Sequence, residues 1–379
     1  MNIAFDAKRA YSNSTGLGHY SRTLISSLAL YYPEHEYFLC APKISKRFDT
    51  SAFQNVHAVT PQQFPSTVLK SLWRSSLVKK DLKQLNINLY HGLSHEIPVG
   101  IEKTGIKSVV TIHDLIFERY PKQYNAIDVQ IYRRKFRNAC KHADKIIAIS
   151  KQTKEDIIQF YKIPEKKITV CYQSCDPAFG VEINDAEKLR IKKKYNLPDQ
   201  FFLYVGSVIE RKNLLTICKS IHQLKDKLNI PLVVIGEGEK YKQQVKEYIN
   251  ASGLQQKIIF LSEAYSFDSS VDFPAIYQQA LCMIYPSIFE GFGIPVLEAL
   301  WSKIPVITSN VSCLPEAGGE GALYIDPMNT EQMADAMMRI AKDDNQRNNL
   351  ITKGLQHAQH FTPQKCAEAV MSVYKSLMA

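Results

Sequence analysis

The chain alternates short apolar runs with longer stretches of helical periodicity, and this alternation constrains the fold more than any other feature. Short apolar runs are typical of buried parallel strands, and a helix between two runs is the connection that parallel strands need. The runs form two sets. The first set comprises residues 2–5, 37–41, 88–90, 108–112, 145–149 and 168–172. The second set comprises residues 201–205, 232–235, 257–261, 281–285, 305–308 and 323–325.

A polar, charged stretch from Asp176 to Gln200 separates the two sets and contains Pro177 and Pro198. We expect it to hold the domain junction and the first helix of the second domain. A length of 379 residues suits two domains. The pattern predicts an α/β fold of two doubly wound, Rossmann-like domains that face a cleft. Ligands of such sheets bind beyond the carboxyl ends of the strands, so motifs that follow strands are the functional candidates.

Cysteine usage and apolar content exclude several classes of protein. The eight cysteines are scattered, mostly in apolar runs, and none forms a CxxC pair. This pattern indicates reduced, buried thiols in a cytoplasmic protein rather than a disulfide framework or a zinc site. No apolar run approaches the roughly 20 residues of a membrane span. The chain begins with a strand-like run, so we expect no signal peptide.

A net charge of +10 points to anionic partners, which could be nucleic acid, an acidic membrane surface or a phosphorylated small molecule. Much of the charge lies in two basic segments of helical periodicity, residues 68–85 and 133–141. We favour helices that pack their apolar stripe on the first sheet. The alternative is peripheral contact with an anionic membrane that presents a lipid-linked acceptor. Nucleic acid is not expected, because the nearby aromatics fit helix packing.

The most informative motif is the sequence PSIFEGFGIPVLEA at residues 286–299. It sets Glu290 and Glu298 eight positions apart around a glycine-containing turn. Pro295 suits the first position of a helix, which would place Glu298 in the first helical turn. The amides at such a helix start attract phosphate. Two carboxylates beside an anion site suit a sugar nucleotide, which has hydroxyls on both sides of a diphosphate.

A second motif, YVGSVIERKN at residues 204–213, follows a predicted strand. The strand ends at Gly206, and a short loop then delivers Arg211 and Lys212 before a helix. Arginine offers a planar fork to phosphate oxygens, and lysine offers a mobile point charge. Cations at a helix start oppose the helix dipole, so they suggest a compensating anion. A solvated basic pair is the alternative interpretation.

Together these motifs resemble the retaining glycosyltransferases of family 4, whose fold is GT-B. The resemblance extends through SCLPEAG at 312–318, TIHDLIF at 111–117 and ADKIIAIS at 143–150. It therefore runs along the whole chain and is closest to bacterial mannosyltransferases. It implies an acceptor-side domain of residues 1–177, on which residues 362–379 pack back. It also implies a domain of residues 178–361 that binds the nucleotide sugar.

The resemblance carries roles over to individual residues. Arg211 and Lys212 correspond to the pair that grips the donor diphosphate, Glu290 to the carboxylate at the donor sugar, and Glu298 to the one at the ribose. His113 corresponds to a histidine near the reactive side of the sugar. The expected catalytic residues are Glu290, His113, Arg211 and Lys212. The expected donor-binding residues are Gly16, Gly18, Gly206, Arg211, Lys212, Glu290, Gly291, Phe292, Gly293, Ile294 and Glu298.

Some weaker motifs stay open between a functional and a structural interpretation. The glycines Gly16 and Gly18 match a glycine-rich loop after the first strand, but they do not form a full GxGxxG. The sequence Gly-Glu-Gly at 236–238 is equally compatible with a base pocket and with a plain turn. His91 and His95 follow a predicted strand and could shape an acceptor pocket.

The expected reaction moves a hexose from a nucleotide diphosphate sugar, with GDP-mannose as the best candidate, to a glycan or lipid-linked acceptor. The resemblance implies retention of the anomeric configuration. We expect no metal and no further cofactor, because no Asp-x-Asp sequence suggests a divalent cation and Arg211 and Lys212 can stabilise the leaving diphosphate. Alternatives are a UDP-glucose or UDP-N-acetylglucosamine transferase, or another GT-B enzyme such as a sugar-nucleotide epimerase. A phosphorylase would need a pyridoxal-phosphate lysine, which no motif supports. A non-catalytic basic binding protein would not need the Glu290–Glu298 spacing.

Overall fold

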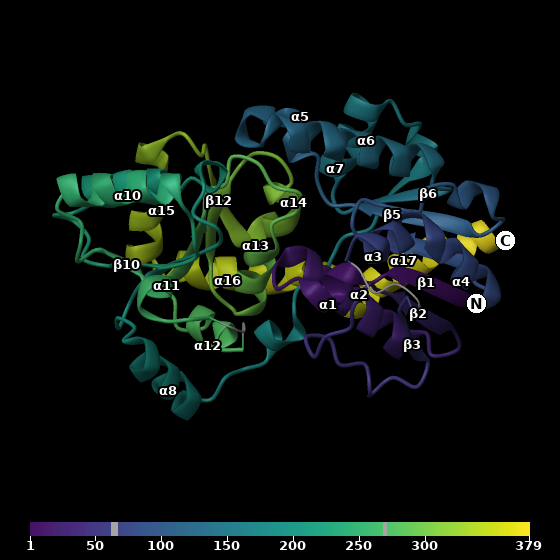
Figure 1. Cartoon of the computed structure of the whole chain (residues 1–379). Coiled ribbons are helices and arrows are strands. Elements are labelled where there is room, and N and C mark those ends of the chain that lie inside the picture. Colours follow the sequence, from purple (N-terminus) through teal and green to yellow (C-terminus); the bar gives the residue numbers. More distant parts are fainter. Residues whose placement is uncertain (62–66, 268–270) are drawn as a thin grey trace. The chain divides into compact units, whose positions relative to one another are not determined.

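The computed structural model describes residues 1–61, 67–267 and 271–379 (Figure 1). Its contacts divide the chain into two compact units. Unit 1 comprises Met1–Cys175 and Phe361–Ala379, and unit 2 comprises Asp176–His360. Unit 2 begins at Asp176, the first residue of the polar stretch that separates the two sets of apolar runs.

Unit 1 contains a seven-stranded sheet in the order β3-β2-β1-β4-β5-β6-β7, and its paired strands are parallel. The strands are β1 Asn2–Asp6, β2 Glu36–Cys40, β3 Val56–Val59, β4 Leu89–Gly92, β5 Lys107–Ile112, β6 Lys145–Ala148 and β7 Ile168–Val170. The α-helices of this unit are α1 Lys8–Ser12, α2 Gly16–Tyr31, α3 Thr67–Leu72, α4 Val78–Gln84, α5 Ile116–Arg119, α6 Ala126–His142, α7 Lys151–Tyr161 and α17 Pro363–Met378.

Unit 2 contains a six-stranded sheet in the order β10-β9-β8-β11-β12-β13, again with parallel pairs. The strands are β8 Phe202–Val205, β9 Leu232–Ile235, β10 Ile258–Phe260, β11 Cys282–Tyr285, β12 Val306–Ser309 and β13 Ala322–Ile325. The α-helices are α8 Asp185–Tyr195, α9 Leu214–Gln223, α10 Lys240–Ala251, α11 Leu261–Ala264, α12 Phe273–Tyr277, α13 Ile294–Trp301, α14 Leu314–Gly318, α15 Thr330–Lys342 and α16 Asp344–Ala358.

The predicted α/β class is confirmed, and every predicted apolar run overlaps a strand. The prediction missed β3, which is an edge strand. Its residues are only half-buried or exposed, and His57 reaches out to the Glu36 carboxylate at 2.6 Å. A strand without a buried face has no apolar run to reveal it.

Alternate residues of β1 enter different cores, as the period of a strand requires. Ile3 and Phe5 of β1 are buried on one face of the sheet with α2 and α17, whereas Ala4 is buried on the other face. The C-terminal helix α17 contributes Val370 and Tyr374 to the first of these cores, so it belongs to unit 1 (Figure 1).

A buried hydrogen-bond chain fixes α17 to the sheet. The Tyr374 hydroxyl lies 2.5 Å from Nδ1 of His91, whose Nε2 lies 2.8 Å from the Thr111 hydroxyl. Thr111 in turn bonds the hydroxyl of Tyr20 on α2 at 3.0 Å. Burial lowers the pKa of His91 to about 3, so this ring is neutral and serves as a structural link.

The two basic segments form the predicted helices of unit 1. Residues 68–85 form α3, a π-helical turn at Trp73–Leu77 and α4, which together place Trp73 and Leu82 in the core. The helix α6 places Phe136 there as well. The favoured interpretation of helices packing on the sheet therefore holds for the apolar residues. None of the described helices combines the length and apolar content that crossing a membrane requires.

Candidate functional site

The candidate site of unit 2 lies where the strand order of its sheet reverses. The chain runs from β8 outward to β10 and then returns to β11, which pairs directly with β8. Ligands of doubly wound sheets bind at this point, beyond the carboxyl ends of the two strands. Arg211 and Lys212 follow β8, and Glu290 follows β11. The topology thus brings together residues from two distant motifs.

A single carboxylate oxygen joins these residues. Oε1 of Glu290 lies 2.8 Å from Nη1 of Arg211 and 2.8 Å from Nζ of Lys212. The Tyr285 hydroxyl donates to the same oxygen at 3.1 Å and accepts a hydrogen bond from Lys212. The ammonium group also lies 4.6 Å from the centre of the Tyr285 ring. Two cations, one carboxylate and one phenol therefore form a compact polar cluster.

The cluster is ionised although it is nearly inaccessible to solvent. Burial alone would raise the pKa of Glu290, but Lys212 and Arg211 outweigh burial and lower the pKa to about 2. Burial lowers the pKa of Lys212, and Glu290 partly offsets that effect. The glutamate is therefore a carboxylate at neutral pH, and it neutralises part of the positive charge of Arg211 and Lys212.

Backbone contacts tie the two loops of the cluster together. Asn213 adopts a left-handed conformation with φ of 58°, and its side-chain amide donates to the carbonyls of Pro286 at 3.3 Å and Pro327 at 2.6 Å. The amide of Ile288 donates to the Arg211 carbonyl at 2.8 Å. Arg211 and Glu290 are thus held in register by hydrogen bonds that do not involve their charges.

The turn into α13 differs from the prediction by one residue. Gly293 has φ of 104° and caps the helix, which begins at Ile294. Pro295 is therefore the second helical residue rather than the first, and Glu298 lies in the second turn rather than the first. Because Gly293 adopts the left-handed capping conformation, the helix begins one residue earlier than predicted. Proline is tolerated at the second helical position because the amide of that residue has no acceptor within the helix. Gly291 and the buried Phe292 form the bend before it.

Glu298 has surroundings unlike those of Glu290. The Tyr277 hydroxyl of α12 donates to its Oε2 at 2.8 Å. Burial raises the pKa of Glu298 to about 7, because no cation pairs with it closely enough to reverse the effect. The two carboxylates of the motif therefore differ in charge state near neutral pH.

Tight backbone packing explains the glycines of the β8 and β9 loops. A Cβ atom on Gly236 would lie 1.9 Å from the carbonyl oxygen of Gly206, and one on Gly238 would lie 2.1 Å from that of Val208. Gly206 itself has φ of 148° and borders the aliphatic chain of Lys212. The Gly-Glu-Gly sequence therefore brings one loop against the other and supports the loop that leads to Lys212.

The unit 1 candidate His113 directly follows the carboxyl end of β5. Nε2 of His113 lies 2.9 Å from the Leu93 carbonyl, and the His113 carbonyl accepts a hydrogen bond from Thr153 at 3.2 Å. The ring contacts Tyr20 and His95 edge-on. Burial lowers the pKa of His113 to about 4, so the ring is neutral at pH 7.

The expectation of a glycine-rich loop at Gly16 and Gly18 is wrong, because both glycines lie in the first turn of α2. Gly18 permits a close approach: its Cβ would lie 2.0 Å from the Asn13 carbonyl oxygen. The loop that precedes them is the segment from Asn13 to Thr15, capped by hydrogen bonds to the Asn13 side chain.

Sequence reasoning missed three side chains that complete the unit 2 site. Tyr285, Tyr277 and Asn213 bond Lys212, Glu298 and the Pro286 loop respectively. Asn213 ends the quoted ERKN motif, so its position was visible although its role was not. A tyrosine at the end of an apolar run gives no comparable signal, because most such tyrosines only pack.

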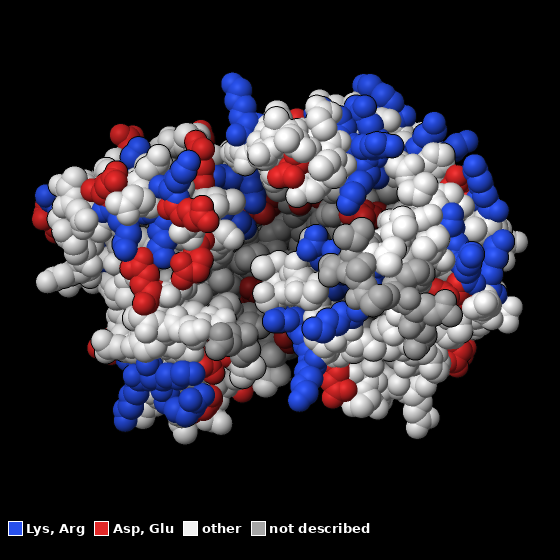
Figure 2. Space-filling view, in the orientation of Figure 1, with Lys and Arg blue, Asp and Glu red and all other residues white. Residues whose placement is uncertain are grey.

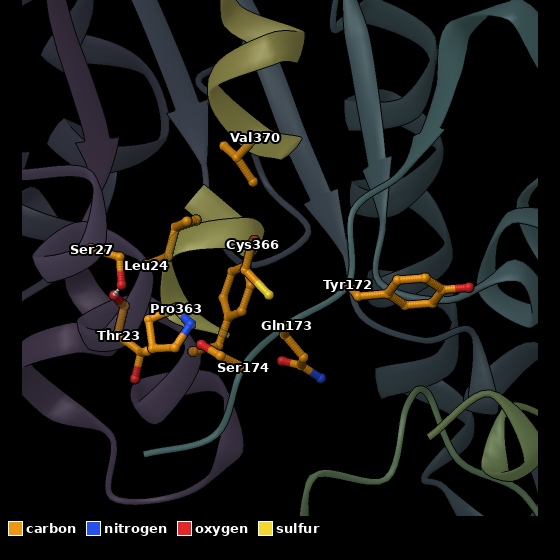
Figure 3. Close-up of a pocket in the computed structure, with 10 residues that line it drawn as sticks. Thr23, Leu24, Ser27, Tyr172, Gln173, Ser174, Pro363, Cys366 and Val370 are labelled. Carbon is orange, nitrogen blue, oxygen red and sulfur yellow. Dashed lines mark hydrogen bonds between the residues drawn. The ribbon is translucent and has the colours of Figure 1, made fainter. Parts of the chain in front are cut away.

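A small cavity lies elsewhere in unit 1, between α2, α17 and the chain that leaves β7 (Figure 3). Its volume of about 10 Å³ suits a single water molecule rather than a sugar. It is lined by Tyr20, Thr23, Leu24, Ser27, Tyr172, Gln173, Ser174, Pro363, Cys366 and Val370. Among the described residues, no group of three metal-ligating side chains is present.

Comparison with known proteins identifies the family. Residues 15–179 match the model of Glycosyltransferase Family 4, and residues 185–357 match that of Glycosyl transferases group 1. The chain belongs to the group 1 glycosyltransferases. It is therefore a glycosyltransferase, as the motifs at residues 204–213 and 286–299 predicted.

Individual relatives agree with this family. The chain is 25% identical to O-antigen chain mannosyltransferase B of Escherichia coli over the full length of both proteins. It is 29% identical to O-antigen chain mannosyltransferase RfbU of Salmonella typhimurium over 65% of each chain. The crystal structure of a glycosyltransferase from Rickettsia africae covers 100% of this chain and 98% of its own, with 18% identity and a TM-score of 0.76. The predicted GT-B fold is confirmed.

Proposed function

We propose that this glycosyltransferase moves mannose from GDP-mannose to a saccharide acceptor, free or lipid-linked, in the synthesis of an O-antigen-type polysaccharide. The observation that carries the proposal is the shared Oε1 of Glu290, which lies 2.8 Å from each of two largely buried cations where the strand order of the sheet reverses. A site that holds positive charge beside a carboxylate suits a sugar linked to a diphosphate. Mannose is proposed because the two relatives from Escherichia coli and Salmonella typhimurium are named O-antigen chain mannosyltransferases.

In the proposed reaction, the bond between the anomeric carbon and the diphosphate oxygen breaks, and negative charge develops on the diphosphate. Arg211 and Lys212 stabilise that charge, assisted by the first amides of α13, which have no acceptor within the helix. The acceptor hydroxyl attacks the same face of the sugar, and its proton passes to the departing phosphate oxygen. Configuration is then retained without a covalent enzyme intermediate.

The carboxylates and the histidine bind rather than react. Glu290 accepts hydrogen bonds from sugar hydroxyls once the diphosphate has taken over its two cations, and Glu298 accepts from the ribose. His113 contributes its neutral ring or its carbonyl to the reactive side of the sugar. A glycosyl adduct trapped on Glu290 would contradict this mechanism and favour double displacement.

The decisive test combines donor screening with a double variant. We expect GDP-mannose to raise the melting temperature of the wild-type chain more than UDP-glucose or UDP-N-acetylglucosamine, because a ligand that binds only the folded state stabilises it. The variant Arg211→Ala/Lys212→Ala should retain its fold by circular dichroism and lose nearly all transfer. Near-normal turnover would remove the pair from the site, and a UDP-sugar preference would replace the mannose assignment.

An epimerase of the same fold is the alternative class of enzyme, and it differs from a transferase in that it needs no acceptor. An epimerase would convert the nucleotide sugar in the absence of any acceptor, whereas the proposed transferase requires one. Nuclear magnetic resonance of the donor after incubation with enzyme alone separates the two. The same method, applied to the transfer product, reads the anomeric configuration.

Peripheral contact with an anionic membrane on the cytoplasmic side belongs to the same proposal. Ile127 and Ile131 of α6 are 70% and 45% exposed, and they share a helix face with the exposed Arg134 and Lys141. Blue side chains gather in Figure 2 over the part of unit 1 where Figure 1 draws α6. Apolar residues ringed by cations suit acidic lipid. Co-sedimentation with phosphatidylglycerol vesicles but not phosphatidylcholine vesicles would support the contact, and Ile127→Asp should abolish it.

A further inference from the structure

The strand order of the unit 1 sheet also reverses, between β1 and β4, and we call this place the switch point of unit 1. The chain runs from β1 outward to β3 and returns to β4, which pairs with β1. Residues that follow these two strands at their carboxyl ends therefore occupy the position where doubly wound sheets bind ligands. Lys8 and Arg9 follow β1, and Glu96 follows β4.

Both carboxylates at this edge already have cationic partners. Asp6, which is 2% exposed, lies 2.5 Å from Nη1 of Arg74. Nη2 of Arg74 lies 2.7 Å from Oε2 of Glu96, and the ammonium group of Lys135 lies 3.1 Å from Oε1 of the same side chain. The direct ion-pair partners of Asp6 and Glu96 are thus Arg74 and Lys135 rather than Lys8 or Arg9.

Lys8 and Arg9 form no direct ion pair within the part of the chain that the structure describes. Among the described residues, neither the Lys8 ammonium nor the Arg9 guanidinium has a hydrogen-bond or ion-pair partner. Burial lowers the pKa of Lys8, repulsion from Arg74 and Arg9 lowers it further, and attraction to Asp6 and Glu96 offsets only part of this effect. Nearby His95 and His113 add no positive charge, because burial keeps both rings neutral.

The backbone that carries this pair is held in place. The amide of Ala7 donates to the Cys40 carbonyl at 2.9 Å. The guanidinium group of Arg22 donates to the carbonyls of Ala10 and Asn13, both at 2.9 Å. The backbone from which both cations project is therefore fixed at a ligand-binding edge, which lowers the entropic cost of binding an anion.

We propose that Lys8 and Arg9 bind a phosphate group at the switch point of unit 1. A planar guanidinium fork beside a mobile ammonium is suited to tetrahedral phosphate oxygens. The phosphate belongs to the acceptor, because unit 2 has its own cation pair for the donor diphosphate. This assignment to the acceptor rests on the proposed function, whereas the phosphate site itself does not. The acceptor is accordingly a phosphorylated or diphosphate-linked saccharide.

Calorimetric titration of the full chain with inorganic pyrophosphate tests the site. We expect two binding sites in the wild type and the loss of one, by about tenfold or more in affinity, in Lys8→Gln/Arg9→Gln. The variant Arg211→Gln/Lys212→Gln should lose the other. The matched control Lys46→Gln/Arg47→Gln, an adjacent exposed pair of the same unit, should retain both. Unchanged binding by Lys8→Gln/Arg9→Gln would overturn the proposal, provided its melting temperature is that of the wild type. Charge-conserving Lys8→Arg should retain both sites.

Titration with GDP separates the two possible sources of the phosphate. If the acceptor carries it, Lys8→Gln/Arg9→Gln should leave the Kd for GDP unchanged and raise the KM for a diphosphate-linked acceptor about tenfold. Weakened GDP binding would overturn the assignment to the acceptor. Failure of the proposed function would look different: the wild type would bind pyrophosphate at two sites and yet use no GDP-mannose.

Discussion

At the scale of single residues, Glu290 acts as an internal anion for Arg211 and Lys212 in the free protein. Its Oε1 stands 2.8 Å from each cation, a distance that a phosphate oxygen would also take. On the proposed function, binding of the diphosphate exchanges one anion for another at these cations. The exchange frees Glu290 for the sugar hydroxyls, so donor binding and sugar recognition are coupled through one carboxylate.

This exchange predicts the behaviour of Glu290→Gln. Without the carboxylate, two largely buried cations lose their partner, and we expect the free energy of unfolding to fall by about 3 kcal/mol. GDP should then raise the melting temperature more in the variant than in the wild type, because its diphosphate supplies the missing charge. The matched control is Glu320→Gln, which removes the exposed carboxylate paired with Lys353. Equal GDP shifts in variant and wild type would argue against the exchange.

The charged residues of this cluster were predictable from sequence because each follows an apolar run within a few positions. The phenols were not, since Tyr285 and Tyr277 act through contacts across the sheet and between helices. The electrostatic difference between Glu290 and Glu298 was equally hidden. It depends on which carboxylate lies against the cations of another loop, and sequence spacing does not specify that.

At the scale of elements, the loop after β9 supports the loop that leads to the cation pair. The prediction concerns Gly236→Ala, whose new Cβ would lie 1.9 Å from the carbonyl oxygen of Gly206. The two loops must separate, and we expect a loss of about 1–3 kcal/mol in unfolding free energy. The larger effect should be on donor binding, because Gly206 borders Lys212. Calorimetric titration with GDP measures the change in donor affinity. If Gly236→Ala is destabilised but binds GDP as tightly as the wild type, the loop after β9 does not position Lys212.

A buried hydroxyl of α17, that of Tyr374, makes a polar contact with the sheet. Tyr374→Phe keeps the ring but leaves Nδ1 of His91 without its partner, so unit 1 should lose about 1–2 kcal/mol of unfolding free energy. In a Trp301→Phe background, the buried Trp73 reports the urea unfolding of unit 1 by fluorescence. Ser372→Ala on the exposed face of the same helix is the control. A Tyr374→Phe midpoint equal to that of the control would mean that the hydroxyl contributes nothing.

Most elements could be predicted from periodicity, and the exceptions have local causes. The edge strand β3 has no buried face to produce an apolar run. The start of α13 shifted by one residue because Gly293, rather than Ile294, adopts the capping conformation. The family resemblance placed Gly16 and Gly18 in a loop, whereas both lie in α2, where the nearby Asn13 carbonyl leaves no room for a Cβ atom at Gly18.

At the scale of the whole molecule, the two units have separate cores and opposite responses to acid. Burial keeps the pKa of His91 at about 3 and that of His113 at about 4, below the ordinary value of 6.5. The unfolded chain therefore binds protons below pH 6.5 that folded unit 1 does not. Unit 1 loses stability as the pH falls from 6.5 toward 4.

Unit 2 should respond in the other direction over the same range. Burial raises the pKa of Glu298 from 4.5 to about 7, so the folded unit holds a proton that the unfolded chain releases. Stability from this group increases as the pH falls from 7 toward 4.5, while Glu290, with a pKa of about 2, stays ionised. Hydrogen exchange at pH 7 and pH 5, corrected for intrinsic rates, should show weaker protection of β4 and β5 at pH 5 and stronger protection of β8 and β11. Glu298→Gln should remove the gain in unit 2 and leave the loss in unit 1, whereas equal shifts in both units would contradict the assignment of these groups.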